Sequence, residues 1–235
     1  MGRDHEINED YALADSDAGV FIVADGLGGK PRGDLASRAA VEAFFNKVKC
    51  MRQSGFLDEG ELKKAVEAAE TGVRHLAETD PLLDGMSTTL SAAVLCGSHG
   101  KIVHIGDSRV YHYRSSGLRL LTRDHNLAED LLRQNQISSR TAAKSPLRNV
   151  LSRCVGVGGV VEADILDFTL KPADLLLLTT DGLGKIMERD SLKRILDQGR
   201  GCTARELCEQ IMEKATGNPL PDDITLIVVR MRTAS

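Results

Sequence analysis

Residues 10–26 have the sequence DYALADSDAGVFIVADG. Within this stretch, residues 11–15 and 20–24 have the composition of short strands, and the polar residues between them are typical of a turn. In an antiparallel hairpin the start of the first strand lies beside the end of the second. Asp10 and Asp25 would therefore oppose each other with their Cβ atoms roughly 5 Å apart. The stretch predicts a sheet edge at which two carboxylates meet.

The rest of the chain consists of blocks with helical spacing and blocks with strand composition. Asp58 followed by Glu61 is typical of a capping box at a helix start. Helices are predicted at residues 34–48, 58–76, 127–135 and 203–216. Strands are predicted at residues 88–96, 101–105, 109–114, 118–122, 160–170, 175–180 and 224–231. Because these elements do not follow a strict β-α-β alternation, the sequence favours an α+β layered sandwich over a doubly wound sheet.

Composition limits the classes of partner and the compartment. A net charge of −4 argues against nucleic acid or an anionic membrane as the main partner. The five cysteines are widely spaced, which fits reduced thiols, and the longest apolar runs have only strand length. The amino-terminal segment is charged from its third residue, unlike a signal peptide. We expect a soluble, cytoplasmic, monomeric protein whose residues 1–235 form a single domain.

More aspartates stand at the ends of predicted strands. Asp181 directly follows one strand, Asp107 follows another, and Asp222 directly precedes the last one. If the strands beside Asp181 and Asp222 run antiparallel, these two side chains share a sheet edge as well. Carboxylates this close repel one another, so either a cation neutralises them or their pKa values rise.

The candidate ligands are all oxygen atoms. Oxygen ligands select hard ions such as Mg²⁺ or Mn²⁺ over zinc or copper. Two such ions ~3.5–4 Å apart are a common device for hydrolysing phosphate esters. Taken alone, Asp25-Gly26 or Asp181-Gly182 is more often a plain turn. Repetition of the same arrangement at several strand ends is what favours a metal centre.

Seven short motifs occur in the order seen in the protein phosphatase 2C family, the metal-dependent serine/threonine phosphatases. They are Asn8-Glu9-Asp10, DGLGG at 25–29, GMSTT at 85–89, GDSR at 106–109, LSRCVG at 151–156, TDG at 180–182 and DDIT at 222–225. The chain resembles the bacterial, stand-alone branch of that family. The resemblance implies a four-layer α-β-β-α sandwich, in which two antiparallel sheets are flanked by helices. It also implies hydrolysis of phosphoserine or phosphothreonine in proteins that a serine/threonine kinase has modified.

The resemblance further implies a centre of two Mn²⁺ or Mg²⁺ ions. Carried over by motif, Asp25 would bridge the two metals and the Gly26 carbonyl would bind one of them. Asp181 and Asp222 would bind the other. Asp107 matches the position of a third, weaker metal.

Catalytic and substrate-binding roles follow from the same motifs. Asp10, with Glu9 nearby, would hold the attacking water, and residues 138–147 would form a flap that selects substrates. The family has an arginine three residues before Asn8, where this chain has His5. Arg3 would face the same side of an extended chain, so we predict that Arg3 and His5 together bind the phosphate.

Two other functions compete with this interpretation. The chain could be a weak or inactive pseudophosphatase that serves as a signalling or partner-binding module, because His5 replaces the arginine. It could also be a metal-dependent hydrolase of small phosphoesters. The crowded aspartates disfavour the first, since a site without a metal gains little from uncompensated charge.

Overall fold

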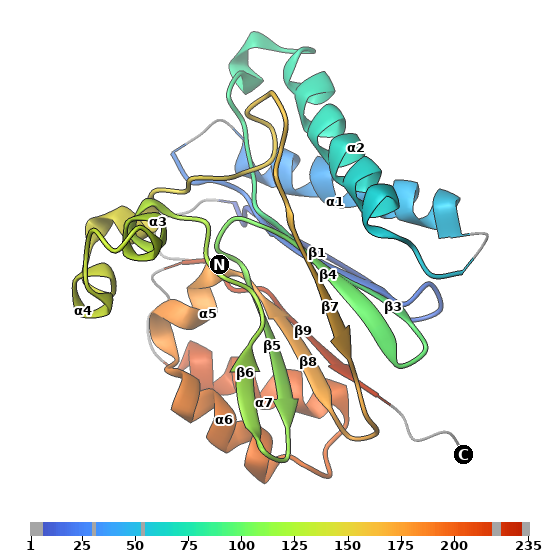
Figure 1. Ribbon diagram of the computed structural model, residues 1–235, viewed down its shortest axis with the longest axis vertical. Coiled ribbons are helices and arrows are strands. Elements are labelled where there is room, and N and C mark those ends of the chain that lie inside the picture. The colour runs from blue at the N-terminus through green and yellow to red at the C-terminus, as the bar shows by residue number, and fades with distance from the viewer. Residues whose placement is uncertain (1–6, 30–31, 53–54, 218–221, 232–235) are drawn as a thin grey trace.

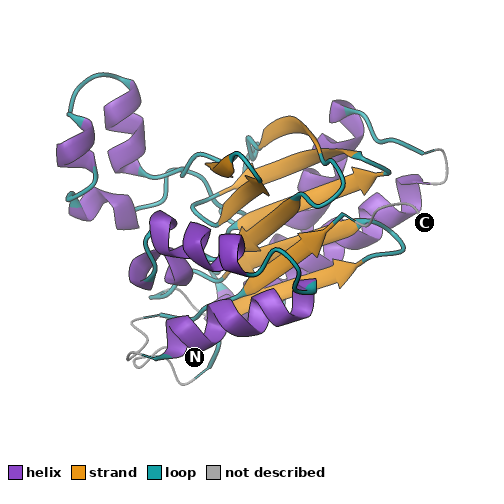
Figure 2. Cartoon of the chain, turned by 90° about the horizontal axis from the view of Figure 1, so that it is seen from below, coloured by secondary structure: helices purple, strands orange, loops and turns teal. Residues whose placement is uncertain are grey.

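The protein is a sandwich of two antiparallel sheets between outer helices. A computed structural model describes residues 7–29, 32–52, 55–217 and 222–231. Figure 1 shows α1 and α2 on one side of the sheets and α5, α6 and α7 on the other. Figure 2, seen from below, also places the strands between helices. The predicted α+β four-layer sandwich is confirmed.

The first sheet is built around the hairpin of residues 10–25. Its strands lie in the order β1-β2-β3-β4-β7, and each pair is antiparallel. Their bounds are β1 Asp10–Asp15, β2 Val20–Asp25, β3 Leu90–Cys96, β4 His99–Ile105 and β7 Asp164–Thr169. The outer face of this sheet is covered by α1 (Gly33–Met51) and α2 (Glu59–Ala77).

The second sheet is formed by four strands between residues 109 and 230. Its order is β6-β5-β8-β9, again antiparallel throughout. The bounds are β5 Arg109–Arg114, β6 Gly117–Leu120, β8 Leu175–Thr179 and β9 Leu226–Arg230. Between β8 and β9 the chain forms α5 Asp181–Ile186, α6 Arg189–Gln198 and α7 Ala204–Thr216. Outside the sandwich, α3 (Leu127–Arg133) and α4 (Ser139–Ala142) project to one side, as Figure 1 shows. Short 3₁₀ turns are η2 Pro81–Leu83 and η3 Pro146–Asn149.

The alternation of side chains along β2 explains its unbroken apolar sequence. Ile22 and Ala24 are buried against the helices that cover the first sheet. Phe21 and Val23 point to the opposite face and pack against Leu176 and its neighbours in the second sheet. Because both faces of β2 are covered, every position from Val20 to Ala24 is buried and apolar.

The predicted elements differ from the observed ones in three places. The strand predicted at 160–170 begins only at Asp164, because residues 156–159 contain three glycines in a turn conformation. The segment 138–147, for which no helix was predicted, contains α4, whose first turn is capped by Ser138. Two helices, α5 and α6, are additional to the predicted ones.

Within the described residues, no helix combines the length and apolar character needed to cross a membrane.

Candidate metal centre

The first pair of aspartates lies at the edge of the hairpin, as predicted. Asp10 and Asp25 are direct partners in the register of β1 and β2. The backbone of Asp25 is held by hydrogen bonds with Thr88 and Thr89. Its N–H donates to the Thr89 hydroxyl at 2.9 Å, and its carbonyl accepts from the Thr89 N–H at 2.9 Å and the Thr88 hydroxyl at 2.8 Å. The motif at 85–89 therefore positions Asp25.

Gly26 allows the chain to pass very close to the start of α1. A Cβ atom on Gly26 would lie 2.3 Å from the carbonyl group of Gly33. The Gly26 N–H donates to the Glu9 carbonyl at 3.0 Å, which joins this turn to the segment before β1. Only a glycine permits such an approach.

The second pair of aspartates lies at the edge between β8 and β9. These strands are antiparallel, so Asp181 after β8 and Asp222 before β9 reach the same end of the sheet, as predicted. A Cβ atom on Gly182 would lie 1.9 Å from the carbonyl oxygen of Asp223. Glycine is therefore required for the Asp181 turn to pack against residues 222–223.

Thr180 joins the two sheet edges. Its hydroxyl donates to Asp10 Oδ2 at 2.8 Å and accepts from the Thr225 N–H at 3.0 Å. Asp223, where the family motif has asparagine, is almost fully buried and accepts from the Glu9 N–H at 3.0 Å. The segment before β1 is thus held against the start of β9, which brings carboxylates from both sheets together.

These groups surround a cavity of about 440 Å³. Asp25, Gly26, Asp107, Asp181 and Asp222, the five predicted metal ligands, all line it. The other lining residues are Glu9, Leu27, Gly28, Ser87, Asn149, Val150, Leu151, Cys154, Val157, Lys185 and Asp223.

Asp10 lies behind this lining. Its Oδ2 accepts from Thr180, and its Oδ1 is buried without a hydrogen-bond partner. Asp181 Oδ1 is likewise buried without a partner. Two orphaned carboxylate oxygens at one site indicate an unmet demand for a cation or a donor.

The electrostatics of the cavity agree with crowded negative charge. Burial, with repulsion from Asp10 and Asp181, raises the pKa of Asp25 well above its ordinary value. Burial also raises the pKa of Asp10 to about 7, and burial with repulsion from Asp181 raises that of Asp107 to about 7. Strongly perturbed carboxyl groups in one cavity are typical of functional sites.

Lys185 is a cation that the sequence interpretation missed. It lies one turn after Asp181 on α5, with its Nζ 2.6 Å from Asp181 Oδ2, and it also contacts Asp222 Oδ2. Within the described part of the chain, it is the only lysine, arginine or histidine in the lining. Burial lowers the pKa of Lys185, but attraction to Asp181 and Asp222 outweighs burial and raises the pKa above its ordinary value. The spacing of four residues from Asp181 would have revealed Lys185 had the segment been predicted as a helix.

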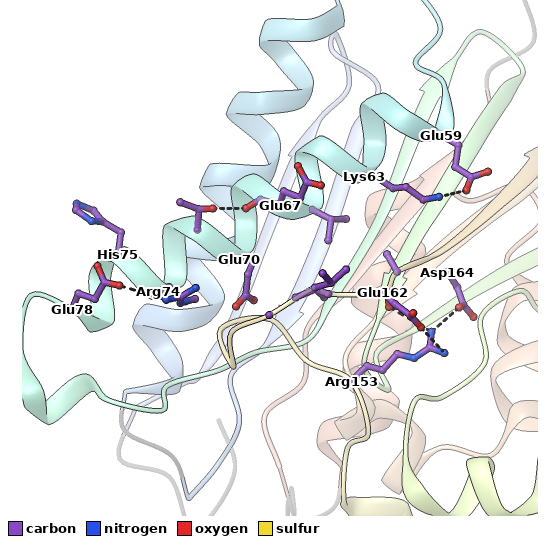
Figure 3. Close-up of a pocket in the computed structure, with 16 residues that line it drawn as sticks. Glu59, Lys63, Glu67, Glu70, Arg74, His75, Glu78, Arg153, Glu162 and Asp164 are labelled. Atoms are coloured by element: carbon purple, nitrogen blue, oxygen red, sulfur yellow. Dashed lines mark hydrogen bonds and ion pairs between the residues drawn. The ribbon is translucent and has the colours of Figure 1, made fainter.

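A larger hollow of about 840 Å³ lies between α2 and the segment that follows Arg153 (Figure 3). Its cations are paired with neighbouring acids: Lys63 with Glu59 at 2.7 Å, Arg74 with Glu78 at 3.7 Å and Arg153 with Asp164 at 3.0 Å. The 440 Å³ cavity holds the carboxylates with too few neighbouring cations. We therefore propose it, rather than the larger hollow, as the candidate active site.

A family model described as Protein phosphatase 2C matches residues 2–215. The chain belongs to the protein phosphatase 2C family. Among relatives, the serine/threonine phosphatase stp of Listeria monocytogenes is 36% identical over 212 residues, which cover 89% of this chain and 83% of that protein.

Solved structures of protein phosphatase 2C relatives share the fold. The Mycobacterium tuberculosis serine/threonine phosphatase PstP/Ppp superposes with a TM-score of 0.86 at 28% identity, covering 99% of this chain and 95% of that one. The catalytic domain of the phosphatase PstP in complex with two manganese ions superposes with a TM-score of 0.81 at 27% identity, covering 97% and 93%.

The donor set of this phosphatase 2C cavity fits Mn²⁺ or Mg²⁺. The ligands are all oxygens, and two carboxylate oxygens are buried without partners. However, among the described residues no three acidic, histidine or cysteine side chains already form a ligand group around one point. The ammonium of Lys185 lies between Asp181 and Asp222 and forms ion pairs with both. The chemistry of the donors, rather than their present spacing, supports the metal site.

Other predicted site residues have different outcomes. Arg3 and His5 lie outside the described residues, so their phosphate-binding role stays a prediction. Residues 138–147, the expected flap, do not line the cavity. The nearby residues that do line it are 149–151. Cys154 and Val157 also line the cavity and were not predicted as site residues, although Cys154 lies within the motif at 151–156.

Proposed function

We propose that this protein phosphatase 2C chain hydrolyses phosphoserine and phosphothreonine in proteins, with the carboxylate cavity as its active site. The observation that carries the proposal is the meeting of aspartates from the edges of both sheets in one cavity. The activity itself is that of the family, whose relatives are named serine/threonine phosphatases. Residues 1–235 would form one domain, acting as a cytoplasmic monomer.

The metal ligands are assigned from the lining of the cavity. Asp25, Gly26, Asp181 and Asp222 would hold two Mn²⁺ or Mg²⁺ ions, and Asp107 would hold a third. When bound, such ions lower the pKa of a water molecule and polarise the phosphoryl oxygens. The protein supplies the fixed positions of these carboxylates, through Thr89 beside Asp25 and through Gly182 beside Asp181.

Asp10 and Glu9 would orient the attacking water. Because the Thr180 hydroxyl holds Asp10 Oδ2, the side chain is fixed with Oδ1 as its remaining acceptor. Glu9 lines the cavity, and its backbone is tied to Asp223. A water molecule that donates to these oxygens would present a lone pair to the phosphorus, which is the alignment that in-line attack needs.

The rim of the cavity favours a protein substrate over a small phosphoester. Val150 and Val157 line the cavity and are 45% and 62% exposed. Exposed apolar side chains beside a charged centre can contact the residues that flank a phosphorylated serine or threonine. A small, fully polar phosphoester offers nothing for them to bind. We therefore expect products of a serine/threonine kinase as substrates, with no role for nucleic acid.

The deciding experiment compares a phosphothreonine peptide with an aryl phosphate, each with Mn²⁺ and with a chelator. We expect Mn²⁺-dependent release of phosphate from the peptide, with a kcat/KM above that of the aryl phosphate. Asp25→Asn should lower kcat by at least about a hundredfold, since it removes the bridging charge. No turnover of either substrate with Mn²⁺ would favour the pseudophosphatase interpretation. Turnover that survives thorough chelation would contradict the metal mechanism.

A further inference from the structure

Lys185 occupies the position between two of the proposed metal ligands. Its Nζ lies 2.6 Å from Asp181 Oδ2 and contacts Asp222 Oδ2 as well. The two aspartates come from separate segments, one at the start of α5 and the other before β9. Their side chains are only 20% and 23% exposed, and that of Lys185 is 34% exposed. The ammonium is therefore shared inside the cavity rather than lying on an open surface.

A second lysine on the neighbouring helix shows what an ordinary pair of this spacing looks like. On α6, Lys193 Nζ lies 2.5 Å from Oδ2 of Asp197, which is four residues later in the chain. Asp197 has further partners in Tyr113 and Arg200. Lys193 lines no cavity that contains the catalytic carboxylates, whereas Lys185 reaches a second carboxylate across the site.

Arg109 is another cation near these aspartates, and it is already engaged. Arg109 lies two residues after Asp107 and forms a bidentate ion pair with Asp124. Its Nε donates to Asp124 Oδ1 at 3.0 Å and its Nη2 donates to Asp124 Oδ2 at 2.7 Å. A guanidinium held in this way has little freedom to turn toward the cavity. Lys185 is the flexible cation at this site, because its four-carbon stem can carry the ammonium away from the aspartates.

We propose that Lys185 is an internal counter-ion that competes with the divalent metal for Asp181 and Asp222. The inference rests on the proposed function only in taking these two aspartates as metal ligands. The ammonium of Lys185 occupies the space between the two carboxylates that a divalent cation bound by both would take, and two cations at such short range repel each other. Metal binding must therefore move Lys185 out of its ion pairs. Without metal, Lys185 limits the repulsion between the aspartates, and the metal affinity is correspondingly lowered.

Removal of the ammonium tests the competition without using activity as the readout. Lys185→Met keeps the length of the side chain and deletes the charge. In chelator-treated protein we expect Mn²⁺ to bind about tenfold more tightly by isothermal titration calorimetry, the factor that corresponds to about 1.4 kcal/mol. The melting temperature without metal should fall, and the gain in melting temperature on adding Mn²⁺ should grow. Lys193→Met is the matched control and should leave the Mn²⁺ affinity unchanged.

A second measurement uses the wild-type chain and does not depend on a variant that folds. Amine-reactive labelling with mass spectrometry should find Lys185 protected without metal and several-fold more reactive with Mn²⁺, while Lys193 stays constant. Equal or weaker Mn²⁺ binding by Lys185→Met, or unchanged labelling of Lys185 when Mn²⁺ binds, would overturn the proposal. Tight Mn²⁺ binding without hydrolysis would instead refute the proposed function and leave the competition intact. If Mn²⁺ does not bind the wild-type protein, both the proposed metal-dependent function and the proposed competition are wrong.

Discussion

At the scale of single residues, the site depends on side chains that the sequence marks clearly and on others that it does not. Asp25, Asp107, Asp181 and Asp222 could be predicted because each stands at a strand end, and strand ends follow from apolar patterns. Lys185 could not be predicted in the same way, because its position depends on a helix that the local sequence disfavours. What the pattern lacks is information on contacts across the fold.

Gly182 tests whether close backbone packing sets the distance between the two ligand segments. A Cβ atom there would meet the Asp223 carbonyl at 1.9 Å, so Gly182→Ala must push residues 222–223 away from Asp181. We expect a loss of about 1–3 kcal/mol in the free energy of unfolding and weaker Mn²⁺ binding. Urea unfolding and calorimetry measure the two effects.

Gly201→Ala is the control for this change, because a Cβ atom at Gly201 meets nothing within 4 Å. It should leave both quantities close to wild type. Unchanged Mn²⁺ affinity in Gly182→Ala would show that the approach of the two segments does not matter for the site.

At the scale of elements, the wall of the cavity is tied to α2. Glu70 on α2 is 6% exposed, and its carboxylate accepts from the Gly156 N–H at 2.5 Å and the Gly158 N–H at 2.7 Å. Figure 3 shows Glu70 pointing from α2 toward this turn. The same segment presents Cys154 and Val157 to the catalytic cavity. A helix on the outer face of the first sheet therefore positions part of the wall of the carboxylate cavity.

Glu70→Ala tests this connection. It leaves two partly buried N–H groups without their acceptor, which costs about 1–3 kcal/mol of stability. Because the wall then moves more freely, KM for a phosphopeptide should rise more than kcat falls. Glu67→Ala, one turn earlier on the exposed side of α2, should change neither stability nor KM. A KM in Glu70→Ala equal to that of wild type would exclude α2 from substrate binding.

Helix and strand predictions succeeded where the local pattern and the tertiary packing agree. The capping box of Asp58 and Glu61 is present at the start of α2, as expected. The short helix α5 was missed because Gly182 and Gly184 each disfavour a helix by about 1 kcal/mol. It forms because Leu183 is buried in the core of the second sheet, which is a contact that sequence spacing does not reveal.

At the scale of the whole molecule, three apolar layers hold the sandwich together. One lies between the first sheet and its helices, one between the two sheets, and one between the second sheet and α5 to α7. The four-layer arrangement was predicted through the order of the seven motifs. Length and composition alone would have left the class of α+β fold open.

His104 links the stability of this core to pH. The ring is fully buried on β4, with Nδ1 2.8 Å from the Ser91 hydroxyl and Nε2 2.8 Å from the Arg123 carbonyl. Burial, with repulsion from His125, lowers its pKa from 6.5 to about 4. Between these values the unfolded chain binds the proton and the folded chain does not. Through His104, stability should therefore fall as the pH drops from 6.5 to 4 and level off below. The raised pKa values of Asp10 and Asp107 change stability in the opposite direction over this range.

Urea unfolding across this pH range measures the effect, which should reach on the order of 3 kcal/mol for a shift of this size. The contribution of His104 is the difference in slope between wild type and His104→Gln, because an amide does not titrate there and the aspartates are common to both proteins. A slope unchanged in His104→Gln would assign the pH dependence to other groups.

We propose that carboxylates from the edges of both sheets hold metal ions in one cavity. Crystals grown with Mn²⁺ and measured at its absorption edge test it most directly, because the anomalous signal locates each ion. We predict two adjacent Mn²⁺ peaks in contact with Asp25, one of them also bound by Asp181 and Asp222, with Lys185 turned away. Peaks confined to other parts of the surface, or an empty cavity at saturating Mn²⁺, would contradict the account.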